Sequence, residues 1–99
     1  MNQVDHRQLK IMLECINHFN SNLITLSSFI SSMEFLFHAL EEADEDWDEA
    51  MLEEIANLES VNSGVPSTVN EAIAKNIVSE ALINIEKLVN SRLRNVSLR

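Results

Sequence analysis

Hydrophobic residues recur every three or four positions in four stretches of the chain, the spacing that places side chains along one side of an α-helix. The predicted helices span residues 5–19, 25–43, 46–61 and 68–93. Their stripes contain Leu9, Met12, Leu13, Ile16 and Phe19 in the first; Leu26, Phe29, Ile30, Met33, Phe37 and Leu40 in the second, with Leu36 at the edge; Trp47, Met51, Ile55 and Leu58 in the third, flanked by Leu52; and Ile73, Ile77, Ala81, Leu82, Ile85, Leu88 and Val89 in the fourth.

Polar residues mark the expected helix ends. The predicted N-terminal caps are Asp5, Thr25, the pair Asp46 and Glu49, and the pair Thr68 and Glu71. The segments 20–22 and 62–67 are predicted breaks, the second because it contains Gly64 and Pro66. Arg92 and Arg94 are expected to complement the negative C-terminal end of the last helix.

The fold predicted from these elements is a single all-α domain over residues 1–99, an antiparallel bundle of about four helices. The chain has 99 residues, enough for one core, with one Gly and one Pro. The stripes are about half a helix wide, which favours a bundle over an isolated two-stranded coiled coil. The connections are short, so antiparallel neighbours are expected.

Charge is distributed unevenly along this pattern. No Lys or Arg occurs between Lys10 and Lys75, while 13 of the 16 acidic residues lie there. Such a region attracts a basic partner and repels nucleic acid. We therefore predict that a basic protein is bound by the residues Glu41, Glu42, Asp44, Glu45, Asp46, Trp47, Asp48, Glu49 and Glu53.

Composition argues against several other classes of protein. The net charge of −9 makes direct binding to nucleic acid phosphates improbable. The single Cys15 excludes an internal disulfide and suits a reducing compartment. The N-terminus has no apolar signal region, and no apolar run approaches the length needed to span a bilayer. We expect a cytoplasmic protein that does not bind membranes.

The motifs of catalysis and metal binding are incomplete. Asp44, Asp46 and Asp48 have the spacing that begins a calcium loop, but Glu49 stands where Gly is needed and Ile55 where a bidentate Glu is needed. Cys15 and His18 lack a second pair of metal ligands. The chain has no Gly-rich phosphate loop and no G-x-S-x-G motif. We expect no enzymatic activity, metal or cofactor.

Trp47, the only Trp, has two interpretations. It is either a core anchor that holds the third helix to the second, or an aromatic contact at an interface, where Trp is enriched.

The segments 22–26, 40–44 and 46–47, together with Leu36 and the pair Leu58 and Glu59, give the chain a family resemblance. Over residues 20–60 it resembles small acidic helical bacterial proteins, some of which are immunity proteins encoded beside toxins of contact-dependent inhibition or polymorphic toxin systems. The resemblance implies a protein that neutralises a cognate toxin, often a nuclease, by binding on or beside its active site.

The leading hypothesis is therefore an immunity protein whose acidic side chains occupy the phosphate-binding site of a nuclease toxin. The alternative is a small helical adaptor or regulatory subunit that self-associates through an apolar seam on the second or fourth helix. A homodimer remains open under either hypothesis. A DNA-mimic regulator of a host nucleic-acid-binding protein is a third interpretation.

Overall fold

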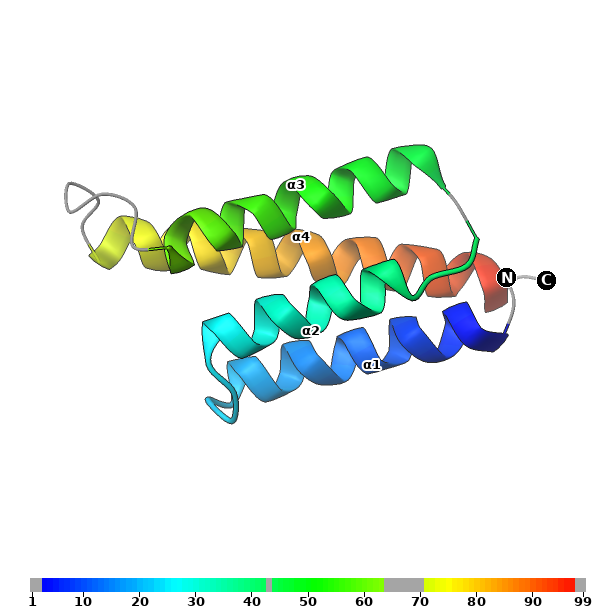
Figure 1. Cartoon of the computed structure of the whole chain (residues 1–99), viewed down its shortest axis with the longest axis horizontal. Coiled ribbons are helices and arrows are strands. Elements are labelled where there is room, and N and C mark those ends of the chain that lie inside the picture. The colour runs from blue at the N-terminus through cyan, green and yellow to red at the C-terminus, as the bar shows by residue number, and fades with distance from the viewer. Residues whose placement is uncertain (1–2, 43, 64–70, 98–99) are drawn as a thin grey trace.

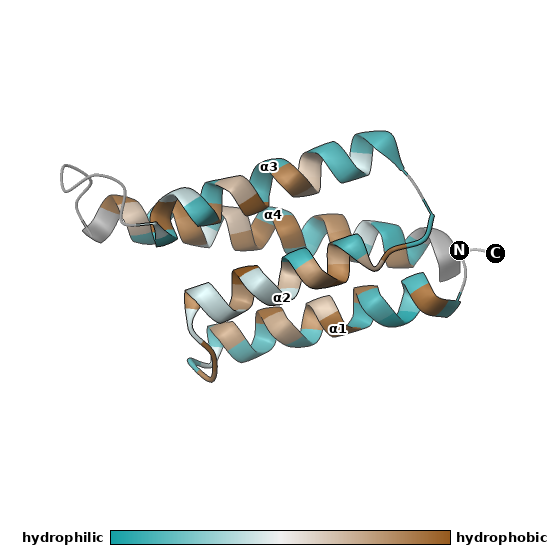
Figure 2. Cartoon of the chain, in the orientation of Figure 1, coloured by the Kyte–Doolittle hydropathy of each residue, from teal (hydrophilic) through white to brown (hydrophobic). Residues whose placement is uncertain are grey.

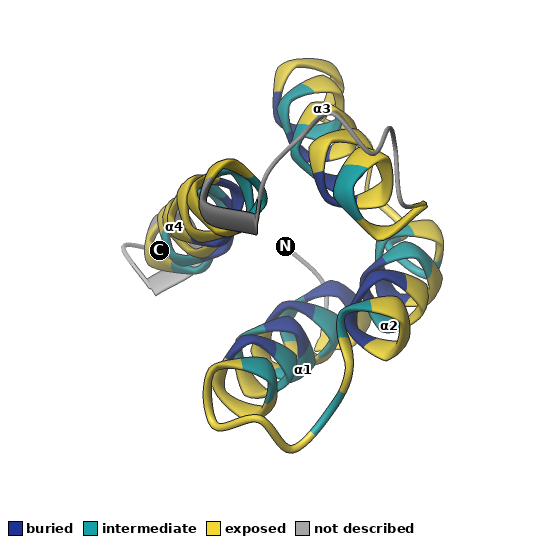
Figure 3. Ribbon diagram, turned by 90° about the vertical axis from the view of Figure 1, so that its left-hand side faces the viewer, coloured by how far each residue is buried: buried dark blue, intermediate teal, exposed yellow. Residues whose placement is uncertain are grey.

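The computed structural model describes residues 3–42, 44–63 and 71–97, and these form four helices: α1 (Gln3–Asn20), α2 (Leu26–His38), α3 (Glu45–Asn62) and α4 (Glu71–Ser97). The helices run alternately in opposite directions (Figure 1). α1 and α3 each pack against both α2 and α4, so the four helices form a ring with α1 diagonally across from α3 (Figure 3). The predicted all-α bundle is confirmed.

The core lies inside this ring, where the buried sides of the helices face one another (Figure 3). All four predicted stripes contribute to it. Its fully or nearly buried members are Leu9, Met12, Ile16, Phe29, Ile30, Met33, Leu36, Trp47, Met51, Ile55, Leu58, Ala81, Leu82, Ile85 and Val89. Leu36, Ile73 and Ile77 differ from the prediction, and Ile77 is only half-buried and not part of the core. Leu36 belongs to the core, not to its edge, and Ile73 is 48% exposed because it lies near the start of α4, beyond the core residues of that helix.

The predicted break between the first two helices is confirmed. Asn22 takes a positive φ of 62°, which Asn tolerates better than most residues. The N–H of Leu23 donates to the carbonyl of His18, and the N–H of Asn22 donates to that of Phe19, so α1 ends in a Schellman motif. Thr25 then caps α2, as predicted, by accepting a hydrogen bond from the N–H of Ser28 at 3.1 Å.

The second helix is shorter than predicted because it ends at His38 and not at residue 43. A longer helix would direct the N–H groups of Glu41 and Glu42 to carbonyls one turn earlier. They instead donate to the two carboxylate oxygens of Asp5, at 2.7 and 2.9 Å. The prediction that Asp5 is the N-cap of α1 is therefore wrong. Asp5 is a buried residue inside the first turn of that helix.

The third helix begins before the predicted capping box. Asp44 is its N-cap and accepts a hydrogen bond from the N–H of Trp47 at 3.2 Å, so Asp46 lies inside the first turn. The fourth helix continues beyond residue 93 to Ser97. The predicted break at Gly64 and Pro66 and the Thr68 cap lie outside the described residues.

Candidate partner-binding surface

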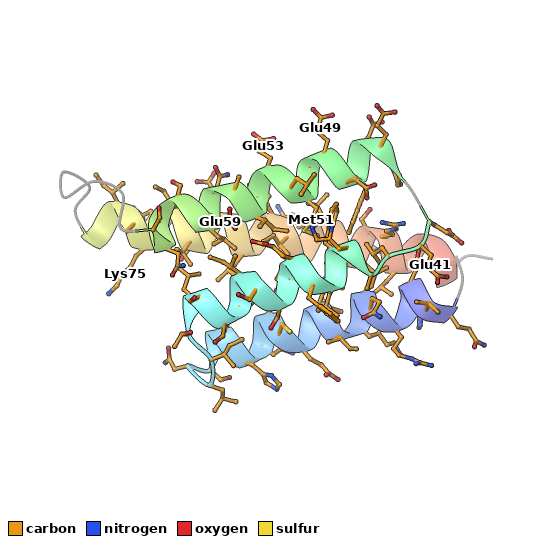
Figure 4. The ribbon with its side chains drawn as sticks, viewed as in Figure 1. Glu41, Glu49, Met51, Glu53, Glu59 and Lys75 are labelled. Carbon is orange, nitrogen blue, oxygen red and sulfur yellow. The ribbon has the colours of Figure 1, made fainter. Side chains whose placement is uncertain are left out.

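Seven of the nine predicted binding residues are exposed. They are Glu41, Glu42, Asp44, Glu45, Asp46, Glu49 and Glu53, and together they are called the acidic surface below. Figure 4 shows Glu49 and Glu53 pointing from α3 away from the bundle, while Glu41 lies in the α2–α3 connection. The first turns of α3 are accordingly hydrophilic in Figure 2. The other two predicted residues differ, since Asp48 is half-buried and Trp47 is buried.

Helical spacing explains why part of the acidic surface is continuous. Glu45, Glu49 and Glu53 follow one another at intervals of four residues, which places them along the outer side of α3. Leu52 lies beside them and is 48% exposed. Leu52, which the sequence pattern puts at the flank of the buried stripe, is therefore an exposed apolar side chain beside the carboxylates.

The start of α3 gives some of these carboxylates a structural role. Besides the cap at Asp44, the N–H of Asp44 itself lies 3.4 Å from Oδ2 of Asp48. Glu45, Asp46 and Asp48 all stand in the first turn, where the positive end of the helix dipole stabilises negative charge by about 0.3–1 kcal/mol per residue. This local stabilisation offsets part of the repulsion among neighbouring carboxylates.

Trp47 anchors α3 to both of its neighbours. Its indole Nε1 donates a 2.8 Å hydrogen bond to the carbonyl oxygen of Leu88 in α4. The ring stacks on Phe37 of α2, with centroids 6.3 Å apart and planes inclined by 14°. Only 8% of the residue is exposed. These contacts match the core-anchor interpretation of Trp47 and add α4 to the helices that it holds.

A buried polar cluster of Asp5, Arg92 and Trp47 lies beneath the α2–α3 connection. Arg92 is 7% exposed, and its guanidinium carbon lies 4.4 Å from the centre of the Trp47 ring. Its Nη2 donates to the carbonyl oxygen of Glu42 at 2.8 Å and lies 3.9 Å from Oδ2 of Asp5. Its Nη1 lies 3.9 Å from Oδ1 of Asp48. The cluster thus ties the ends of α1 and α4 to the backbone that carries Glu41 and Glu42.

Sequence reasoning missed this cluster. The sequence pattern predicts that Arg92 complements the helix dipole and that Asp5 is an N-cap, and it predicts no contact between them. A signal was present, however. Asp5 precedes Leu9 by four residues, and Arg92 follows Val89 by three, so both continue a buried stripe. A charged residue on such a stripe needs a buried partner of opposite charge. Asp5 and Arg92 are such partners for each other.

A groove of about 550 Å³ adjoins the acidic surface between α3 and α4. Glu53 and Glu54 line it from α3, and Asn84 and Lys87 from α4. Asn84 donates to Glu54 Oε2 at 2.7 Å, and Asn57 donates to Oε1 at 3.1 Å. These bonds engage Glu54 within the bundle, so the acidic surface ends at Glu53.

Within residues 3–42, 44–63 and 71–97, no group of three or more His, Cys, Asp or Glu side chains is arranged to hold a metal ion. In the same residues, none of the helices combines the length and apolar character required to cross a membrane. No protein-family model matches the chain, and the searches of curated proteins and of solved structures find no match.

Proposed function

We propose that this chain is a non-enzymatic bacterial immunity protein, which binds a basic cognate toxin of the nuclease type through the acidic surface and neutralises it. The observation that carries the proposal is the placement of charge. Seven exposed carboxylates gather on the α2–α3 connection and the outer side of α3, while Arg92 beneath them is directed into the bundle. A nuclease holds phosphates with Lys and Arg side chains, and carboxylates form charge-assisted hydrogen bonds with the same groups.

The hydrogen bonds that Asp5 and Arg92 form beneath the acidic surface favour this role. Asp5 accepts two backbone hydrogen bonds from Glu41 and Glu42, and Arg92 donates a third to Glu42. The backbone at Glu41 and Glu42 is thereby held before any partner arrives. Less conformational entropy is then lost on binding, which improves affinity. Leu52 supplies an apolar contact beside the carboxylates, which suits the mixed character of protein interfaces.

The charge also suits rapid capture. A toxin must be neutralised before it damages the cell, and complementary charge raises association rates by about 10–10³-fold. Salt at physiological ionic strength screens exposed charges beyond about 8 Å. The proposal therefore predicts association that is fast at low salt and slows as salt is added.

The first test uses the genomic neighbourhood. A gene for a large secreted toxin should lie immediately upstream, and expression of its toxin domain should stop growth unless this chain is expressed with it. An operon of metabolic enzymes, or a lack of protection by this chain, would contradict the proposal.

The second test measures association of that toxin domain with charge-reversed variants. The double variant Glu49→Lys with Glu53→Lys alters the outer side of α3. A matched control reverses two exposed carboxylates elsewhere, with Glu80→Lys and Glu86→Lys on α4. Both variants change the net charge equally.

Stopped-flow kinetics at low salt should show an association rate at least about tenfold lower for the α3 variant than for the control. The difference should shrink at high salt because screening weakens steering. Equal rates for the two variants would mean that net charge alone acts, and the acidic surface would lose its assignment.

The adaptor alternative retains one supporting observation. Phe35 of α2 is 73% exposed, and the second helix is one of the two that were predicted to carry an apolar seam for self-association. This exposure favours a second contact surface, whichever function the acidic surface serves.

A further inference from the structure

An uncharged groove runs along the bundle between α1 and α2, away from the acidic surface. Its volume is about 580 Å³, and its lining consists of Gln8, Ile11, Cys15, Ser31, Ser32, Phe35 and Leu36. None of these residues carries a formal charge, in a chain whose net charge is −9. The groove is thus a part of the surface where another molecule of the same chain approaches with little local repulsion.

The shape of the groove suits a second copy of the chain related by a two-fold axis. Phe35 belongs to the lining of the groove and is 73% exposed, more than any other large hydrophobic residue in the described part of the chain. The neighbouring residues of α2, Ser31 and Ser32, are small and leave the groove open. A protruding aromatic ring beside a shallow apolar groove provides both halves of a self-complementary contact, as a two-fold interface requires.

Two charged residues of α1 also favour a two-fold contact between copies of the chain. Arg7 and Glu14 are both exposed, and they are seven residues apart, so they lie on the same side of the helix. Ile11, which lines the groove, stands between them. Within the described residues, neither Arg7 nor Glu14 forms an ion pair.

If two copies of α1 meet antiparallel about an axis near Ile11, Arg7 of each copy faces Glu14 of the other. In this arrangement both charged residues of each copy gain a partner of opposite charge, and Ile11 of each copy lies at the apolar centre of the contact. Charge complementarity of this kind specifies a partner and its register.

We propose that two copies of this chain form a symmetric dimer through the α1–α2 face, with Phe35 of each seated in the groove of the other and Arg7 paired with Glu14 across the axis. α3 lies diagonally opposite α1 in the bundle (Figure 3), so the part of each acidic surface that lies on α3 is directed away from the dimer contact. The dimer does not depend on the identity of the toxin or on the role of the acidic surface.

Sedimentation velocity of the purified chain, from low micromolar to millimolar concentration, tests the proposal. The wild-type chain should pass from monomer to dimer over this range. Phe35→Ser should raise the dimer dissociation constant by about 30-fold or more, the effect expected for an aromatic residue that dominates an interface. Ile83→Ser is the matched control, since Ile83 is 55% exposed on α4 and should leave the dimer unchanged.

Charge exchange tests the two-fold register. Arg7→Glu alone and Glu14→Arg alone each place like charges opposite one another twice in the dimer, and each should weaken it by about tenfold or more. The double variant Arg7→Glu with Glu14→Arg restores opposite charges and should dimerise within about threefold of the wild type. A partner other than a second copy would not show this recovery.

Cys15 supplies a second readout because it lines the groove. Its reaction with a thiol reagent should slow as the wild-type chain dimerises, and this concentration dependence should disappear in Phe35→Ser. A wild-type chain that remains monomeric throughout, a dimer that survives Phe35→Ser, or a double charge exchange that is no better than its single variants would each overturn the proposal.

Discussion

Asp5 and Arg92 lie at opposite ends of the chain, yet Oδ2 of Asp5 and Nη2 of Arg92 are 3.9 Å apart in the interior of the bundle. Asp5 is fully buried and Arg92 is 7% exposed. Both also bind the backbone of the α2–α3 connection, Asp5 as acceptor and Arg92 as donor. The pair therefore couples the first and last helices to the segment where the acidic surface begins.

Removing the charge of Asp5 should destabilise the fold strongly. Asp5→Asn keeps the shape of the side chain but removes the fully buried charge beside Arg92, which then has, within the described residues, only the half-buried Asp48 as a carboxylate neighbour. It also replaces one of the two oxygens that accept the N–H groups of Glu41 and Glu42. The loss of one member of a buried ion pair costs about 3–5 kcal/mol. Urea unfolding at neutral pH measures the change.

Asp46→Asn is the control for Asp5→Asn, because Asp46 is exposed, and it should change the free energy of unfolding by no more than about 1 kcal/mol, the scale of a first-turn dipole contact. Combining Asp5→Asn with Arg92→Met should cost less than the sum of the two single changes, since the pair is lost only once. Strict additivity would show that the two side chains do not interact.

The indole N–H of Trp47 should contribute measurably to stability. Trp47→Phe keeps an aromatic ring near Phe37 but removes the donor to the Leu88 carbonyl and weakens the contact with Arg92. We expect a loss of about 1–3 kcal/mol. Unfolding is followed by circular dichroism, because the variant has no Trp fluorescence. An unchanged unfolding midpoint would contradict the anchoring role.

Two phenylalanines of α2 provide a matched pair for the core. Phe29 is fully buried and its ring lies 5.3 Å from that of Phe19, whereas Phe35 is 73% exposed. Phe29→Ala should cost about 3–5 kcal/mol because it leaves a cavity. Phe35→Ala should cost no more than about 0.5 kcal/mol when measured at a concentration where the chain is monomeric. Similar losses in the two variants would refute the assigned inner side of α2.

Glu34 of α2 and Glu59 of α3 should give stability a distinct pH dependence. A hydrogen bond with Glu59 is the main cause that raises the pKa of Glu34 above its ordinary value, followed by partial burial and the charge of Glu59. A carboxyl whose pKa is raised on folding stabilises the fold at pH below its unfolded pKa. That contribution disappears as the pH rises through the folded pKa.

Glu59→Gln should therefore stabilise the protein, relative to wild type, more at pH 7 than at pH 4, because the amide donates to Glu34 at either pH. Thermal melts of both proteins across this range measure the difference. Glu34→Gln should show the same trend, since it removes the same pair of acids. A difference between wild type and Glu59→Gln that does not change with pH would contradict the shared hydrogen bond.

Local patterns in the sequence were sufficient for most of the fold. The periodic stripes identified four helices and nearly all of the core, because an amphipathic helix must bury its apolar side. The break at residues 20–22 and the cap at Thr25 were also predictable, since each depends on a few neighbouring residues. The exposure of Glu45, Asp46, Glu49 and Glu53 follows from the same periodicity, which leaves them off the buried stripe of α3.

Long-range contacts decided what local patterns left open. The end of α2 at His38 depends on Asp5, which accepts the N–H groups that would have continued the helix. The burial of Arg92 depends on Asp5, Trp47 and the Glu42 carbonyl, which come from three separate segments. The sequence by itself determined where helices form and which side of each is apolar. Only the tertiary structure decided which polar groups meet in the interior, because buried charges are stabilised by partners that helical periodicity does not specify.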